Sequence, residues 1–216
     1  MKRALMFIVF MTVMSSLKAQ FNNSQYIKWG VTGNFHKGSI VNVHDYSKGK
    51  YGGGLGLFAD IALTENDVFD VAWLYIEPQI EYSMQGEFAK APPFETQKYD
   101  NHYLAAMLYL KWFYNFGNMK RDAFVFAGPR VEYMIMDKKT TTPEYEAGYY
   151  QYNLDHNMEK FGYGVSFGTG IRINKQFEAF LRYDRGFSKV YTDNPEKTYN
   201  RLLAVGINYF INTNWR

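Results

Sequence analysis

Eleven charged residues recur at alternate positions within stretches that are otherwise apolar or small. They are Lys28, Asp60, Glu77, Glu81, Lys111, Arg130, Glu132, Arg172, Glu178, Arg182 and Asp184. Alternate residues share one face of a strand, so we expect these charges to lie together on one side of a sheet. Charges of both signs that are withdrawn from water persist only when they are paired and hydrogen-bonded. The expected chemistry is therefore a network of ion pairs, and the alternative is a narrow charge-lined path or a proton-responsive gate.

Catalytic and metal-binding patterns are weak. The adjacent pair His44-Asp45 supplies two of the three residue types of an acyl-transfer site, but no nucleophile motif accompanies it. All four histidines, at positions 36, 44, 102 and 156, fall in or beside expected loops and lack metal-ligand spacing. The run Gly52-Gly53-Gly54 precedes no helix and no Lys-Ser/Thr pair, so it is not a phosphate loop. We predict no catalytic residue, no metal ligand and no cofactor.

The stretch 73–85 shows which kind of element positions the charges. Every second residue from Leu74 to Met84 is apolar or aromatic, apart from Pro78, whereas the residues between include two carboxylates and two amides. This period of two predicts a strand. A tilted strand of this length that ends in aromatic residues can cross a bilayer.

The same alternation recurs along the chain. We expect eight strands, at residues 26–36, 51–63, 73–85, 103–116, 123–136, 160–173, 177–186 and 200–211. Long polar loops follow the first, third, fifth and seventh strands, at residues 37–50, 86–102, 137–159 and 187–199. Short turns follow the others. The pattern predicts an all-β fold: an eight-stranded antiparallel up-and-down transmembrane β-barrel with long outer loops and short periplasmic turns.

A soluble eight-stranded ligand barrel is the main alternative, because its strands also alternate. In that fold the apolar face would point inward. Here the glycines of residues 51–63 and 160–173 share the face that carries Asp60 and Arg172, and small residues suit a crowded interior. We therefore expect the charged face to be the lumen. Pro78 and Pro129 each remove a ladder donor, and we expect a bulge at each.

The N-terminus and the composition agree with export to the outer membrane. Residues 1–19 resemble a cleavable signal peptide, with Lys2 and Arg3 before a short apolar run and Ala19 at the cut, which leaves 20–216 as the barrel. Removing Lys2, Arg3 and Lys18 lowers the basic count from 24 to 21, equal to the 21 acidic residues, which argues against a nucleic-acid partner. The chain has no cysteine, and aromatic residues make up 19% of it. Abundant aromatic residues fit the girdles of a membrane barrel.

Three segments resemble a known family. They are Lys18-Ala19-Gln20, residues 78–86 (PQIEYSMQG) and residues 126–133 (FAGPRVEY). The chain is similar to the PorT-like outer-membrane β-barrel family of Bacteroidota, a group of small porin-like barrels. The resemblance implies a non-enzymatic membrane protein of the cell envelope, because the family's namesake is an accessory component of the type IX secretion machinery. No functional residue is carried over.

Three functions follow as expectations. The first is a non-enzymatic structural or accessory protein whose outer loops contact other envelope proteins and whose belt contacts outer-membrane lipid. The second is a narrow channel for ions or small solutes. The third is an outer-leaflet lipid-modifying enzyme that uses His44 and Asp45.

Overall fold

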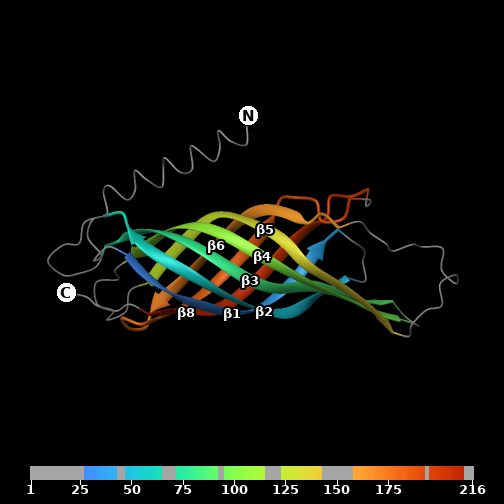
Figure 1. The fold of residues 1–216 in the computed structure, drawn as a ribbon, viewed down its shortest axis with the longest axis horizontal. Coiled ribbons are helices and arrows are strands. Elements are labelled where there is room, and N and C mark those ends of the chain that lie inside the picture. The colour runs from blue at the N-terminus through green and yellow to red at the C-terminus, as the bar shows by residue number, and fades with distance from the viewer. Residues whose placement is uncertain are drawn as a thin grey trace, which may run out of the picture.

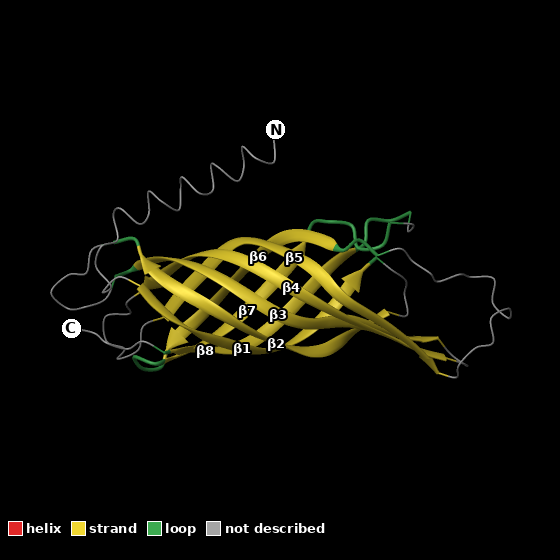
Figure 2. Cartoon of the chain, in the orientation of Figure 1, coloured by secondary structure: helices red, strands yellow, loops and turns green. Residues whose placement is uncertain are grey.

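The protein folds as one closed β-barrel (Figures 1 and 2). The structure is a computed structural model of the chain, and it describes residues 27–42, 47–64, 72–91, 95–114, 123–142, 158–192 and 195–211. The expected signal peptide at 1–19 lies outside these residues. Within the described ranges, no helix has the length and apolar character needed to cross a membrane.

Eight antiparallel strands form the wall, each paired with its neighbours in sequence, and β8 closes on β1. They are β1 (Ile27–Val41), β2 (Ser47–Ala62), β3 (Leu74–Ala91), β4 (Glu95–Tyr114), β5 (Ala123–Thr142), β6 (Phe161–Arg172), β7 (Phe177–Gly186) and β8 (Tyr199–Phe210). The predicted eight-stranded antiparallel barrel is confirmed. The prediction succeeded because alternation in the sequence marks both the strands and the face that each residue occupies. We call the end with the β2–β3, β4–β5 and β6–β7 turns the inner end and the opposite end the outer end. In barrels of this kind the short turns face the periplasm.

The predicted loops at the outer end were too long. The segment 86–102 was expected to be a loop, but β3 continues to Ala91 and β4 begins at Glu95, with unbroken pairing from Gly86↔Asp100 to Ala91↔Glu95. Likewise, β1 continues to Val41, β2 begins at Ser47 and β5 continues to Thr142, within the segments 37–50 and 137–159. Charged residues suggested loops there, but strand pairing continues beyond the lipid because the ladder bonds do not need an apolar face.

Three strands rise above the others as a projecting sheet. We call residues 86–91 of β3, 95–102 of β4 and 136–142 of β5 the outer blade, which Figure 1 shows as the green and yellow strands beyond the barrel rim. Among the described residues, β6 pairs with β5 only up to Tyr133↔Phe161. The far edge of β5 in the blade therefore has no partner strand within that part of the chain.

The expected bulges at the two prolines are wrong. Around Pro78 the register of β2 on β3 stays constant, with Phe58↔Gln79 and Ile61↔Ile76. The register also stays constant around Pro129. A proline removes one donor, and the ladder bonds on either side keep the strands aligned.

The register shifts occur instead where the outer blade leaves the barrel. One lies between Gly49 and Gly54 of β2. The other lies opposite His102 and Tyr103, where Ile135 of β5 is the extra residue. Bulges increase local twist and bend a strand, which suits the place where a blade departs from a closed wall.

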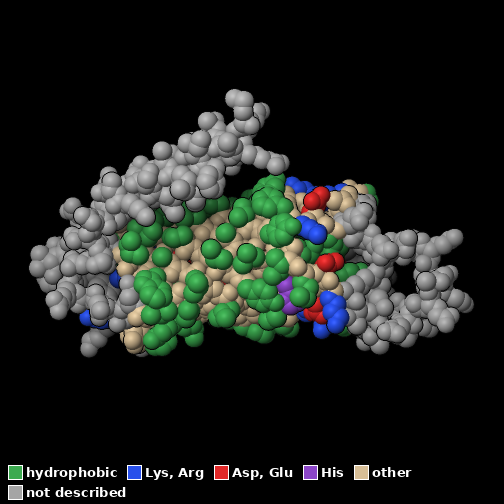
Figure 3. All heavy atoms as spheres, viewed as in Figure 1, with side chains coloured by type: hydrophobic (Ala, Val, Ile, Leu, Met, Phe, Trp, Pro, Cys, Tyr) green, Lys and Arg blue, Asp and Glu red, His purple; other side chains and the backbone are tan. Residues whose placement is uncertain are grey.

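The outside of the barrel is an apolar band between aromatic residues. Leu55, Leu57, Ile80 and Val205 are largely exposed on it, and Figure 3 shows hydrophobic side chains over most of the visible wall. Trp73 marks the inner edge of this band and Tyr82 the outer edge on β3. These two residues are separated by about 30 Å of strand, which at a tilt of about 40° spans about 23 Å, close to the height of a membrane barrel's apolar band.

Candidate functional site

The lumen holds the predicted charges. Ten of the eleven are buried, and Lys28 at the inner end is half-buried. Each side chain points inward because it lies in phase with the lumen-facing residues of its strand. The structure divides these charges into two clusters, one toward each end of the barrel.

The inner cluster surrounds one lysine. The Nζ of Lys111 on β4 lies 3.0 Å from Asp60 Oδ2, 2.8 Å from Glu77 Oε2 and 2.7 Å from Glu178 Oε2. Arg172 donates to Glu178 Oε1 from Nη2 at 2.8 Å and from Nε at 3.1 Å. Five strands are tied together by these contacts. A compact ammonium with three donors suits three separate carboxylates.

Aromatic rings enclose the inner cluster. The ammonium of Lys111 lies 4.7 Å from the ring centre of Phe124 and 5.7 Å from that of Phe210. The guanidinium of Arg172 lies 4.0 Å from the ring centre of Phe113. The Phe124 ring occupies space beside Gly170, where any side chain would overlap it. These rings exclude water and so strengthen the ion pairs between them.

The outer cluster is built on two arginines. Arg182 makes a bidentate pair with Glu81, with Nη1–Oε2 at 2.9 Å and Nη2–Oε1 at 2.8 Å. Its Nε lies 3.2 Å from Asp184 Oδ1. Arg130 binds the other oxygen of Asp184 at 3.0 Å and Glu132 Oε2 at 3.0 Å. The arginines and carboxylates therefore form one chain of ion pairs across the lumen.

Neutral side chains complete the surroundings of Glu81. Gln79 Nε2 donates to Glu81 Oε2 at 2.9 Å, and Asn34 Nδ2 donates to the same oxygen at 3.0 Å. The imidazole of His36 lies 2.7 Å from Asn34 Oδ1 and 2.8 Å from the Met84 carbonyl oxygen. His36 was expected at the end of the first strand, beside a loop, but β1 continues to Val41 and His36 is buried in the lumen.

The connection between β7 and β8 covers part of the outer mouth. We call its described residues, 187–192 and 195–198, the strap. The buried Tyr191 of the strap donates from its hydroxyl to Glu87 Oε1 on β3 at 3.2 Å. Val190 and Tyr191 pack against Ile40 of β1. Burial, followed by the nearby Glu87 carboxylate, raises the pKa of the Tyr191 phenol above its ordinary range.

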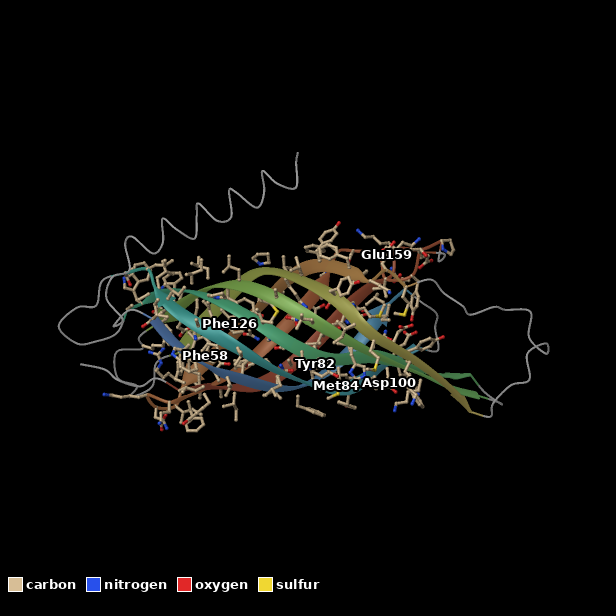
Figure 4. The ribbon with its side chains drawn as sticks, in the orientation of Figure 1. Phe58, Tyr82, Met84, Asp100, Phe126 and Glu159 are labelled. Atoms are coloured by element: carbon tan, nitrogen blue, oxygen red, sulfur yellow. The ribbon has the colours of Figure 1, made fainter. Side chains whose placement is uncertain are left out.

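The strap is also joined to the segment that leads into β6. Glu159 donates its backbone N–H to the Val190 carbonyl at 2.8 Å, and Met158 pairs with Tyr191 as an isolated bridge. Figure 4 shows Glu159 at the outer end, far from Phe58 and Phe126 in the inner half. The strap thus links β1, β3 and the start of β6 across the mouth.

Two small cavities lie among these groups. A cavity of about 10 Å³ lies between the two clusters, lined in part by Tyr109, Phe126 and Phe180. Another of about 10 Å³ lies beside Arg130 and Leu202. One buried water needs about 10–15 Å³, so each of these cavities has room for one water molecule at most.

Sequence reasoning missed several lumen residues. Glu87 lies beyond the predicted end of its strand, whereas His36, Asn34 and Gln79 fall within predicted strands but were not among the eleven charges. A signal for Glu87 was present, because the polar odd-numbered series of β3 from Glu77 onward continues through it. His44, Asp45 and His156 lie outside the described residues. Among the described residues, no group of three or more His, Asp and Glu side chains is arranged to hold a metal ion.

Comparisons with known proteins agree with the fold. Residues 18–192 match the family model described as "Outer membrane protein beta-barrel domain". No curated protein matches the chain.

Among solved structures, the chain is similar to Neisserial surface protein A, with 11% identity and a TM-score of 0.46 over 84% of this chain and 96% of that one. It is similar to OprG from Pseudomonas aeruginosa, with 12% identity and a TM-score of 0.46 over 86% and 94% of the two chains. It is also similar to the outer membrane enzyme PagL, with 10% identity and a TM-score of 0.45 over 82% and 97%. Likeness at this level carries no information on function.

Proposed function

We propose, from the premise that this chain belongs to the outer membrane protein β-barrel domain family, that it is a closed barrel with a structural or accessory role toward other envelope proteins. In this proposal the protein has no enzymatic activity and conducts no ions. The observation that carries it is that two ion-pair clusters, the rings of Tyr109, Phe126 and Phe180 between them, and the strap at the outer mouth occupy the lumen.

The energetics of the clusters support a closed lumen. A conducting path would have to separate pairs such as Arg182–Glu81, in which both side chains are about 1% exposed or less. Breaking a buried pair costs about 3–5 kcal/mol. Several such pairs lie in series along the barrel, so opening the path requires the loss of more than one.

The outer blade supports the accessory role. It extends beyond the lipid and presents the far edge of β5, which has no partner strand among the described residues, a shape that can accept a strand from another protein. The similarity of residues 126–133 to the PorT-like family favours the same kind of role, in an envelope or secretion complex.

Planar-bilayer recording tests the closed lumen. The full chain is expected to give no steady single-channel currents. The quadruple variant Arg182→Ser/Glu81→Ser/Lys111→Ser/Asp60→Ser removes a cation and an anion from each cluster and is expected to conduct. Lys98→Ser/Asp100→Ser removes an ion pair outside the lumen and is the matched control, expected to remain silent. Steady currents from the unmodified protein would overturn the proposal in favour of the narrow channel.

The lipid profile of a deletion strain tests the absence of enzymatic activity. An unchanged profile is the expected result. A changed profile that wild-type protein restores, but a His44→Ala/Asp45→Ala variant does not, would establish the lipid-modifying enzyme instead.

Photo-crosslinking tests the accessory role. A photoreactive residue at Thr140 on the outer blade is expected to capture an envelope protein in intact cells. The same residue at Lys175, in the β6–β7 turn, serves as the control. Equal capture from both positions, or none from Thr140, would remove the blade from the proposal.

A further inference from the structure

The outward face of the outer blade changes character in regular steps away from the membrane. Cross-strand pairing places Tyr82, Leu104 and Tyr133 in one row, followed by a row with Met84, His102 and Met136. Figure 4 shows Tyr82, Met84 and Asp100 succeeding one another toward the outer end. Successive rows are about 7 Å apart along a strand. The next two rows therefore lie just beyond the aromatic edge, at the depth of lipid headgroups.

These two rows carry a cluster of lysines. Asp100 forms ion pairs with Lys50 and with Lys98, the latter at 3.3 Å, and lies directly opposite Lys138 on β5. One row further out, Phe88 lies between Lys48 and Lys98. Figure 3 shows the charged side chains gathered at this end, beyond the hydrophobic band.

The geometry keeps the lysines together. Lys50 reaches Asp100 across Gly86, which lies between them in the sheet and has no side chain to block the path. Gly86 also has a φ of 139°, a backbone conformation that favours glycine. Asp100 thus holds two lysine side chains on one surface and neutralises only one of the four positive charges.

The positive charge that Asp100 does not neutralise lies on the outward face of the sheet, at the depth of the lipid headgroups. Lys98 is half exposed, and none of the carboxylates that the structure describes forms an ion pair with Lys48 or Lys138. At the membrane side of the cluster, the Tyr82 hydroxyl and His102 Nδ1 form a hydrogen-bonded pair. Cations beside the aromatic edge of a lipid belt are placed to meet anionic headgroups.

We propose that Lys48, Lys50, Lys98 and Lys138, arranged around Asp100, form a headgroup patch that binds the phosphate groups of a phosphorylated glycolipid in the outer leaflet. The patch is continuous with the lipid-facing belt, so its ligand is a lipid and not free phosphate. This site lies outside the lumen, and its test is independent of whether the barrel conducts.

Native mass spectrometry of the full chain in detergent tests the patch, with bisphosphorylated lipid A as the probe and enzymatically dephosphorylated lipid A as its neutral partner. The wild type is expected to prefer the bisphosphorylated form. The variant Lys48→Gln/Lys98→Gln/Lys138→Gln keeps the Lys50–Asp100 pair and is expected to lose affinity by roughly fivefold for each lysine, or about a hundredfold in all. Lys160→Gln/Lys175→Gln/Lys197→Gln loses the same charge elsewhere and is expected to bind as the wild type does.

Three results would overturn the patch. One is equal affinity for both lipids, and another is an equal loss in the patch and control variants. The third is displacement of lipid A by inorganic phosphate at the same concentration, which would make the ligand free phosphate. If the triple variant fails to fold, the single Lys138→Gln replacement still decides the matter, with a roughly fivefold loss expected.

Discussion

The inner and outer clusters occupy the same lumen with different cations. The inner cluster places one ammonium among three carboxylates and surrounds it with rings. The outer cluster joins two guanidiniums and three carboxylates in a chain, with one bidentate pair. In the inner cluster all three carboxylates share the Lys111 ammonium, and only Glu178 has a second cation, Arg172. In the outer cluster no single cation contacts all three carboxylates. Loss of a cation should therefore cost more at the inner end.

The largest effect is expected for Lys111→Met. The change leaves Asp60, Glu77 and Glu178 buried without the ammonium that they share, which should lower the free energy of unfolding by about 5 kcal/mol. Urea titration followed by heat-modifiable gel migration measures it. The control, Lys175→Met at an exposed turn, should change stability by less than about 0.5 kcal/mol. An equally small change in the free energy of unfolding for Lys111→Met would contradict the conclusion that the three carboxylates depend on this lysine.

Arg130→Leu should cost less, about 3 kcal/mol. Asp184 retains its contact with Arg182, so the removal strands mainly Glu132. The same titration applies. An unshifted unfolding midpoint would count against the ion-pair closure of the outer half.

Arg182→Lys separates the effect of charge from that of geometry, because it keeps the positive charge and removes only the planar guanidinium group. The bidentate pair with Glu81 should become a single contact, at a cost of about 2 kcal/mol. The double variant Arg182→Lys/Glu81→Gln supplies a double-mutant cycle. Additive losses in that cycle would show that the two side chains do not interact as described.

Tyr191→Phe is expected to have the smallest effect. It removes the hydrogen bond to Glu87 and should lower stability by about 1 kcal/mol. Limited proteolysis within the strap should become faster. Unchanged cleavage would mean that packing against Ile40 and the backbone contacts with Met158 and Glu159 hold the strap without this hydrogen bond.

The same tyrosine gives a pH prediction. Its pKa is raised above 10.0 in the folded protein, so above about pH 10 the unfolded chain releases a proton that the folded chain retains. The stability that wild-type Tyr191 contributes is complete below that pH and declines as the pH rises. The difference in unfolding free energy between wild type and Tyr191→Phe should therefore shrink from about pH 10 upward. Absorbance at the tyrosinate band, wild type minus variant, should show one phenol titrating above 10.

The sequence predicted the barrel because alternation is a local signal. The charges on residues such as Asp60 and Arg182 stand out against apolar neighbours, and every strand places them in phase. How the charges pair was not predictable, because partners such as Glu81 and Arg182 are 101 residues apart in sequence. Their contact depends on the registers of strands that lie between them.

The outer blade was missed for the opposite reason. Gly86, Asp100 and the prolines at 92–93 have the composition of a loop, yet residues 86–91 and 95–100 pair fully as strands. Outside the lipid, a strand has no need of an apolar face, so hydropathy alternation ends before the ladder does. Glu87 and Tyr99 are nevertheless buried and continue the alternation of their strands, and this was the remaining sequence signal for the blade.

The wall of this barrel has unequal height, since β3, β4 and β5 rise above the rim and β6 to β8 do not. The molecule therefore has a front and a back when seen along the membrane normal. A neighbour that recognises the tall side can approach from one direction only. Such a protein would have a fixed rotational orientation about the membrane normal relative to its neighbour, which a rotationally symmetric cylinder could not have.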